Sequence, residues 1–129
     1  MKLLEVKDLT VAFPTENGQK NAVNHISFDL KENDFVGLVG ESGCGKTVAT
    51  QTILGIQPKE AIVKSGSCKQ RGLEVLGLSD RQWSKYRSRN IATVFQEPGS
   101  ALNPLIKVGK QIEEVLIIHY DFDKEKEKN

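Results

Sequence analysis

A glycine-rich octet, GESGCGKT at residues 40–47, constrains the fold of this chain more than any other feature. It matches the spacing G-x-x-x-x-G-K-[ST]. Glycines let the backbone close around an anion with its N–H groups pointing inward, and a following helix adds free amides and its dipole. The apolar run FVGLV (35–39) before the octet and the helical pattern KTVATQTILG (46–55) after it supply this context. The octet therefore predicts a phosphate-binding loop in an α/β fold rather than a chance glycine-rich turn.

The chemistry of the octet assigns roles to its last two residues. Lys46 would place a positive charge between the β- and γ-phosphates of a nucleotide, and Thr47 would give a hydroxyl ligand to Mg²⁺. Cys44 is either a reactive thiol at a helix N-terminus or a small residue that fits the loop. The candidate nucleotide-binding residues of the octet are Gly40, Glu41, Ser42, Gly43, Cys44, Gly45, Lys46 and Thr47.

The apolar periodicity predicts several strands. Residues 9–13 and 23–30 read as two strands joined by the polar loop PTENGQK (14–20), which indicates an antiparallel hairpin. FVGLV and IATVF (91–95) are continuously apolar, which favours central strands buried on both faces. Short strands are also expected around Ile62 and Cys68.

Three segments carry helical signals. Gly55 is placed to end the helix that follows the octet, and Pro58 blocks its continuation. Ser79 and Gln82 form a capping-box pattern before RQWSKYR. Near the C-terminus an amphipathic helix is predicted by residues that fall at helical spacing: Leu105, Val108, Ile112, Val115 and His119.

Composition excludes some classes of protein. The formal net charge is +1, which gives no strong attraction to nucleic acid or to a membrane surface. Two widely spaced cysteines do not form a disulfide framework, which favours reduced cytosolic thiols. No signal peptide is recognisable, and no apolar run approaches the roughly 18 residues that span a bilayer, so membrane association would come through a partner.

Two motifs together resemble one family. The octet is similar to the ABC ATPase form of the loop, and VFQEPGSALNP (94–104) resembles the Q-loop of the oligopeptide and dipeptide importer branch. VGKQIEEVL (108–116) is similar to the start of the helical subdomain in that branch. Gly99 departs from the pattern, since many relatives have a bulkier residue there. The resemblance covers almost the whole chain.

The resemblance implies an α/β fold. It would be a P-loop NTPase (RecA-like) core with an N-terminal antiparallel β subdomain, truncated at the start of the helical subdomain. The chain would be an incomplete ABC nucleotide-binding domain, with the β subdomain and core in 1–95 and the Q-loop and start of the helical subdomain in 96–129. It would bind ATP and Mg²⁺ at the cytoplasmic face of the membrane. Its partners would be permease subunits and a second ATPase subunit, without nucleic acid.

Two residues outside the octet gain roles from the resemblance. Gln96 matches the Q-loop glutamine, which reaches Mg²⁺ or the attacking water and signals to the membrane partner; otherwise it is an exposed loop glutamine. Phe13 occupies the place of the aromatic residue that stacks on adenine, or it is a core residue of its strand. His25 shows no carboxylate and second ligand at metal-site spacing.

The family's later motifs are not among the 33 residues that follow Gln96. These are the LSGGQ-type signature, the Walker B strand with its Asp-Glu pair, and the switch histidine. A truncated chain is therefore expected to bind nucleotide without hydrolysing it, since the carboxylates that complete the Mg²⁺ shell and polarise water are missing.

Other functions stay open at this point. Nickel importers share these motifs, and the transported solute is not chosen in this subunit. A small P-loop kinase would need lid arginines, for which Arg81, Arg87 and Arg89 are the candidates, although a solvated helix face explains them better. A chromosome or DNA-repair ATPase would need sustained heptads, which the sequence lacks.

Overall fold

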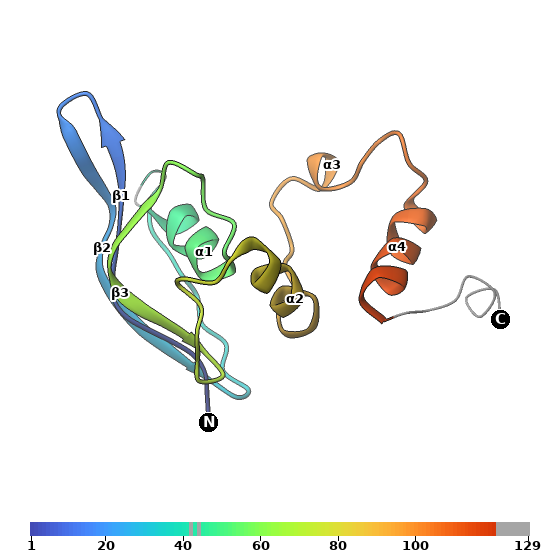
Figure 1. Ribbon diagram of the computed structural model, residues 1–129, viewed down its shortest axis with the longest axis horizontal. Helices are drawn as coiled ribbons and strands as arrows, with labels where there is room; N and C mark the ends of the chain where they lie inside the picture. The colour runs from blue at the N-terminus through green and yellow to red at the C-terminus, as the bar shows by residue number, and fades with distance from the viewer. Residues whose placement is uncertain (42, 44, 121–129) are drawn as a thin grey trace. The chain divides into compact units, whose positions relative to one another are not determined.

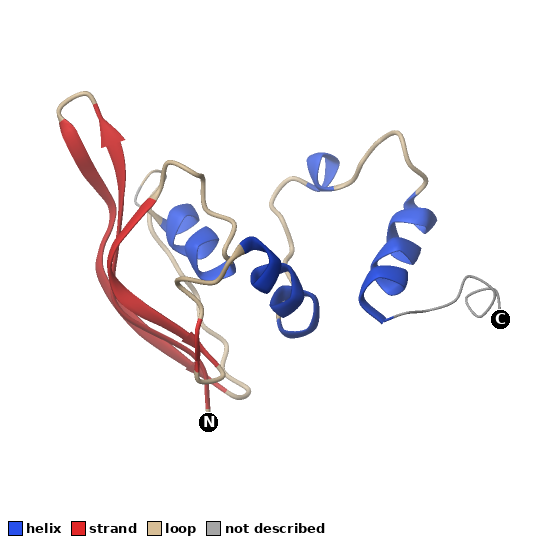
Figure 2. Ribbon diagram, in the orientation of Figure 1, coloured by secondary structure: helices blue, strands red, loops and turns tan. Residues whose placement is uncertain are grey.

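The computed structural model describes residues 1–41, 43 and 45–120, in two compact units that meet between Trp83 and Ser84. Figures 1 and 2 show the elements in chain order: β1 (Lys2–Thr15), β2 (Gly18–Lys31), α1 (Lys46–Leu54), β3 (Ile62–Gln70), β4 (Leu73–Glu74), α2 (Asp80–Asn90), α3 (Pro98–Ala101) and α4 (Val108–Tyr120).

The first unit is built on an antiparallel sheet with the strand order β2-β1-β3-β4. The predicted hairpin is confirmed, but its strands are longer and its loop is shorter than the expected 14–20. Pro14 pairs with Gln19, and Thr15 donates a hydrogen bond from Oγ1 to the Gly18 carbonyl oxygen at 3.0 Å. Gly18 adopts a φ of 114°, which closes a tight turn, so the polar residues beside it stay in the ladder.

The core of the first unit lies between the sheet and α1. The buried apolar side chains are Val6, Leu9, Val11, Ala12, Val23, Ala49, Cys68, Val75 and Trp83. Gln70 of β3 donates a hydrogen bond from Nε2 to the carbonyl oxygen of Ile53 at 2.7 Å, which ties the sheet to the end of α1. The predicted cap is confirmed, since Gly55 ends α1 in the left-handed conformation, and a Cβ there would lie 2.2 Å from the Trp83 ring.

Bulges cluster at one level of three neighbouring strands. Asp8 of β1, His25 of β2 and Gly66 of β3 have φ values of 49°, 51° and 104°. Side-chain hydroxyls satisfy two of the amides that leave the ladder: Ser27 accepts from the Asp8 N–H at 2.8 Å, and Thr10 accepts from the His25 N–H at 3.1 Å. Bulges bend a strand and increase its twist, and Figure 1 shows the strands curving along their length.

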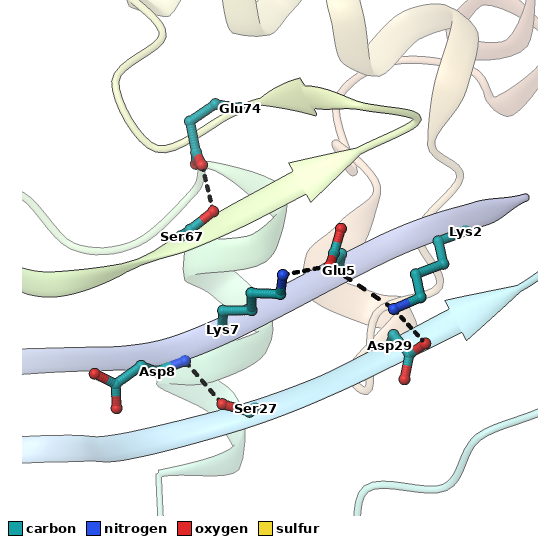
Figure 3. A network of polar contacts seen from close by, with 8 residues as sticks. All are labelled: Lys2, Glu5, Lys7, Asp8, Ser27, Asp29, Ser67 and Glu74. Atoms are coloured by element: carbon teal, nitrogen blue, oxygen red, sulfur yellow. Dashed lines mark hydrogen bonds and ion pairs between the residues drawn. The ribbon is translucent and has the colours of Figure 1, made fainter.

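Charged residues of β1 and β2 form a network of polar contacts, as Figure 3 shows. Lys7 Nζ lies 2.8 Å from Glu5 Oε1, and Lys2 Nζ lies 3.3 Å from Asp29 Oδ2. The hydrogen bond from Lys7 lowers the pKa of Glu5. These exposed pairs contribute little to the stability of the sheet.

The prediction that FVGLV and IATVF form buried central strands is wrong for this structure. Neither segment belongs to a strand, and the side chains of Phe35 and Val94 are about fully exposed, at 101% and 99%. Within the described residues, no strand lies alongside either segment to exchange backbone hydrogen bonds with it. An apolar run forms a central strand only where neighbours pair with both of its edges.

The helices of the C-terminal half follow their predicted signals. The capping box is confirmed: Ser79 donates from its backbone N–H to Gln82 Oε1 at 2.9 Å, and Gln82 donates from its N–H to Ser79 Oγ at 3.3 Å. The helix predicted near the C-terminus is present as α4, but Leu105 lies before its first residue, and the one-turn helix α3 lies within the Q-loop-like segment 94–104. Among the described residues, no helix has the length and apolar character needed to cross a membrane.

Candidate functional site

The glycine-rich octet leads directly into α1. Gly43 and Gly45 have φ values of 83° and 96°, a left-handed backbone that residues with a Cβ rarely adopt. Gly45 is the N-cap of α1 and has no side chain to bond the amides of the first turn, and that turn contains no acidic residue. The N-terminal amides of α1 and its dipole are therefore disposed toward an anion.

Gly45 is also the point where the octet lies against the sheet. A Cβ built on Gly45 would lie 2.2 Å from the carbonyl oxygen of Ala22 in β2, whereas a Cβ on Gly43 would meet open space. Both positions need glycine for their backbone conformation, and position 45 needs it for space as well.

We expect Gly45→Ala to lower the free energy of unfolding of the first unit by at least ~2 kcal/mol. The left-handed conformation costs a residue with a Cβ roughly 1–2 kcal/mol, and the contact with the Ala22 carbonyl adds to this. Denaturant unfolding followed by circular dichroism measures the change. Gly72→Ala is the matched control, since Gly72 also has a positive φ, of 83°, and nothing lies within 4 Å of a Cβ there. Equal stability of the two variants would contradict the close approach.

Lys46 and Thr47 lie at the start of α1, at the edge of the octet. The Lys46 ammonium donates a hydrogen bond to the carbonyl oxygen of Gly40, so its charge is held over the loop. A phosphate oxygen would be a stronger acceptor than this neutral carbonyl, because a charged acceptor strengthens the bond. Thr47 and Glu41 are exposed. Ser42 and Cys44, both predicted to contact nucleotide, lie outside the described residues.

Phe13 lies near the tip of the hairpin. It pairs with Lys20 across β1 and β2, and its side chain is half-buried. This placement suits a ring with one face toward the protein and one face toward water, so both predicted roles stay open.

Gln96 lies in the second unit, between residue 95 and α3, and its side chain is exposed. It lines an open hollow of about 480 Å³ together with Phe95, Glu97, Ser100 and Ala101. The octet belongs to the first unit. An exposed amide beside an apolar ring is available to a ligand or to a partner.

Sequence reasoning missed a hydrogen bond between the side chains of Asp8 and His25. His25 Nδ1 lies 2.6 Å from Asp8 Oδ1, and both side chains are exposed. The two residues are 17 positions apart in the sequence. Their spacing does not predict the two bulges that bring their side chains together. Among the described residues, no group of three or more His, Cys, Asp or Glu side chains could hold a metal ion.

Cys68 is a buried thiol in β3. Burial raises the pKa of Cys68 to about 11, and the nearby Glu74 carboxylate adds to the rise. Burial also opposes ionisation of Glu74, but hydrogen bonds from Ser67 Oγ (2.6 Å) and from the backbone amides of Cys68 (2.9 Å) and Leu76 (3.2 Å) lower its pKa overall. At neutral pH Cys68 is therefore an unreactive core residue.

Comparison with known proteins gives a match over most of the chain. The family model described as ABC transporter matches residues 23–129. The dipeptide transport ATP-binding protein DppD of Lactococcus lactis subsp. cremoris is 41% identical over 118 residues, which cover 92% of this chain and 34% of the relative. The oligopeptide transport ATP-binding protein OppD of Mycobacterium bovis is 44% identical over 117 residues, which cover 91% of this chain and 19% of the relative. The chain thus spans about a third or less of the length of these relatives.

A solved structure shares the fold. The ATP-binding cassette MJ0796, in a dimeric post-hydrolysis state bound to ADP and Pi, superposes with a TM-score of 0.81 at 24% identity. The match covers 95% of this chain and 51% of that chain. The fold is therefore that of the N-terminal part of a P-loop cassette with its antiparallel sheet.

Proposed function

Since this chain belongs to the ABC transporter family, we propose that it is the ATP-binding part of an importer ATPase that powers the uptake of peptides. The observation that carries the proposal is the octet at the start of α1, where two left-handed glycines and the Lys46 ammonium surround a helix N-terminus. The names of the relatives, dipeptide and oligopeptide transport ATP-binding proteins, support peptides as the transported solute.

The residues of the octet fit the triphosphate of ATP. Its glycine amides, the N-terminus of α1 and Lys46 would hold the phosphates, and the space beside Gly43 is open to receive them. Thr47, whose side chain is exposed, and Gln96 would be ligands of Mg²⁺, which neutralises charge on the phosphates when it is bound. Phe13 would stack on adenine. The bound ADP and Pi of the MJ0796 cassette support a nucleotide in this loop.

The proposed partners are the permease subunits of an importer and a second ATPase subunit, at the cytoplasmic face of the membrane. Residues 96–129 would form the Q-loop and the start of the helical subdomain, after a β subdomain and core in 1–95. In this part the exposed apolar side chains that would face the permease include Leu102, Leu105, Ile106 and Val108. ATP binding would draw two such domains together and drive the membrane subunits.

Uptake in the source organism tests the transported solute. In cells that carry Lys46→Ala in this gene, we expect uptake of a labelled dipeptide or oligopeptide to fall at least tenfold, because the phosphates lose their positive partner. Nickel accumulation and uptake of a free amino acid, measured in the same cells, should be unchanged. Loss of nickel uptake with normal peptide uptake would assign the ATPase to a nickel importer instead.

A further inference from the structure

One side-chain amide of α4 holds the segment that connects α3 to α4. Gln111 Nε2 donates to the carbonyl oxygens of Asn103 at 3.0 Å and of Ile106 at 2.9 Å, and Gln111 Oε1 accepts from the Asn103 backbone N–H at 3.1 Å. Asn103 in turn accepts, at Oδ1, a hydrogen bond of 3.0 Å from the Leu105 N–H. The amide thus bonds both backbone groups of Asn103, as a residue of a neighbouring strand does in an antiparallel pair.

The segment held in this way carries exposed apolar side chains. Leu105 is 92% exposed, whereas Leu102 and Ile106 are 47% and 41% exposed. Gln111 itself is half-buried, whereas the four residues after it in α4 are exposed. The amide of Gln111 therefore forms its hydrogen bonds within the second unit, whereas the side chain of Leu105 is exposed to solvent.

We propose that Gln111 is a positioning residue for the contact with the membrane subunits: it fixes the backbone of residues 103–106 so that Leu105 is presented in one shape. This inference rests on the proposed function, which supplies the membrane partner. A loop without such bonds loses conformational entropy when it docks, and a loop already held in its docked shape loses less. The side-chain hydrogen bonds of Gln111 go to Asn103 and Ile106, so the proposal gives it no contact with nucleotide.

The role requires the chemistry of glutamine and not only its size. The Gln111 amide gives two N–H donors to two carbonyl oxygens and one acceptor to a backbone N–H. Glutamate has the same size, but as a carboxylate it lacks the donors and sets a negative charge against the two carbonyls. Methionine keeps the length and lacks every one of these bonds. A residue that only filled space would be replaced by glutamate without effect.

Amide hydrogen exchange on this chain tests the hydrogen bonds directly. In Gln111→Met, which removes the acceptor of the Asn103 N–H, we expect this N–H to exchange at least about tenfold faster, while the Val115 amide in the middle of α4 keeps its rate. Glu113→Gln is the matched control, because it introduces an amide on the opposite side of the helix and should change neither rate. Unchanged protection of Asn103 in Gln111→Met, or equal acceleration throughout α4, would overturn the proposal.

ATPase assays with the membrane subunits in proteoliposomes test the functional part. These assays use the whole ATPase subunit that contains this segment, since the chain alone is expected not to hydrolyse ATP. For Gln111→Met in that subunit we expect kcat and KM for ATP to be unchanged without the membrane subunits, and the stimulation by those subunits to fall severalfold. An equal loss of basal and stimulated rates, or no loss of stimulation, would overturn the positioning role. If the unmodified ATPase shows no stimulation, the proposed function fails, and the exchange rates still decide whether Gln111 holds the segment.

Discussion

Replacing Lys46 with alanine should weaken the binding of ATP to this chain by about tenfold to a hundredfold. The unmodified chain is expected to bind ATP weakly, because it supplies one side of a site that a second ATPase subunit would complete. The Lys46 ammonium lies over the octet, on the Gly40 carbonyl, where it would meet the phosphates. A hydrogen bond between charged groups contributes roughly 1.5–3 kcal/mol, so its loss lowers the affinity by about tenfold to a hundredfold. Isothermal titration calorimetry with Mg·ATP measures this change.

A second lysine provides the control for net charge. Lys59 is exposed in the loop after α1, and Lys59→Ala removes the same charge without touching the octet. This control should bind like the unmodified chain, and equal affinity of the Lys46 variant would refute the phosphate-binding role. The same samples should show no ATP turnover above background, because the chain lacks the Walker B carboxylates. A rate that survives further purification and disappears in Lys46→Ala would refute that account.

The isolated chain should associate in solution instead of remaining a monomer. Phe35, Val39 and Val94 are 101%, 90% and 99% exposed, in two apolar segments with no paired strand beside them in the described part of the chain. Covering such surface gains roughly 25 cal/mol for every Å² of apolar area. Unpaired backbone groups along an extended segment add a second reason for chains to join.

Light scattering at micromolar concentration measures the association. Phe35→Ser should raise the monomer fraction several-fold, because it removes the largest exposed ring of the first unit. Lys20→Ser, at an exposed position of β2, is the control and should leave the distribution unchanged. A sharp monomer peak with cooperative thermal unfolding of the unmodified chain would refute the prediction.

Sequence reasoning succeeded where the signal is local. The capping box at Ser79 and the cap at Gly55 depend on residues a few positions apart, and the structure contains both. It failed for FVGLV, because burial of a strand depends on distant neighbours and not on the apolar run itself. The hairpin turn was predicted too long, because polar residues such as Gln19 can stay in a β ladder when one face of the sheet is open to water.

The same difference between local and long-range signals decides which features of the candidate site and of its surroundings could be predicted. The octet could be found from its spacing alone, because successive backbone amides and one lysine make up most of its chemistry. The three hydrogen bonds of the Gln111 amide could not be predicted from the sequence, because they depend on how the chain turns at Asn103 and Pro104. The pair of Asp8 and His25 likewise depends on two bulges that no pattern in either strand marks.

The contact between Gly45 and Ala22 sets unequal limits on sequence variation at the two positions. The atom that a Cβ at position 45 would strike is the backbone carbonyl oxygen of residue 22, which every amino acid possesses. Exchange of the half-buried Ala22 side chain therefore leaves the obstacle in place, and no substitution at position 22 makes room for a larger residue at position 45. Side-chain substitutions in the hairpin therefore leave the requirement for glycine at position 45 unchanged. A second substitution that relieves this contact in a Gly45 variant has to move the backbone of β2.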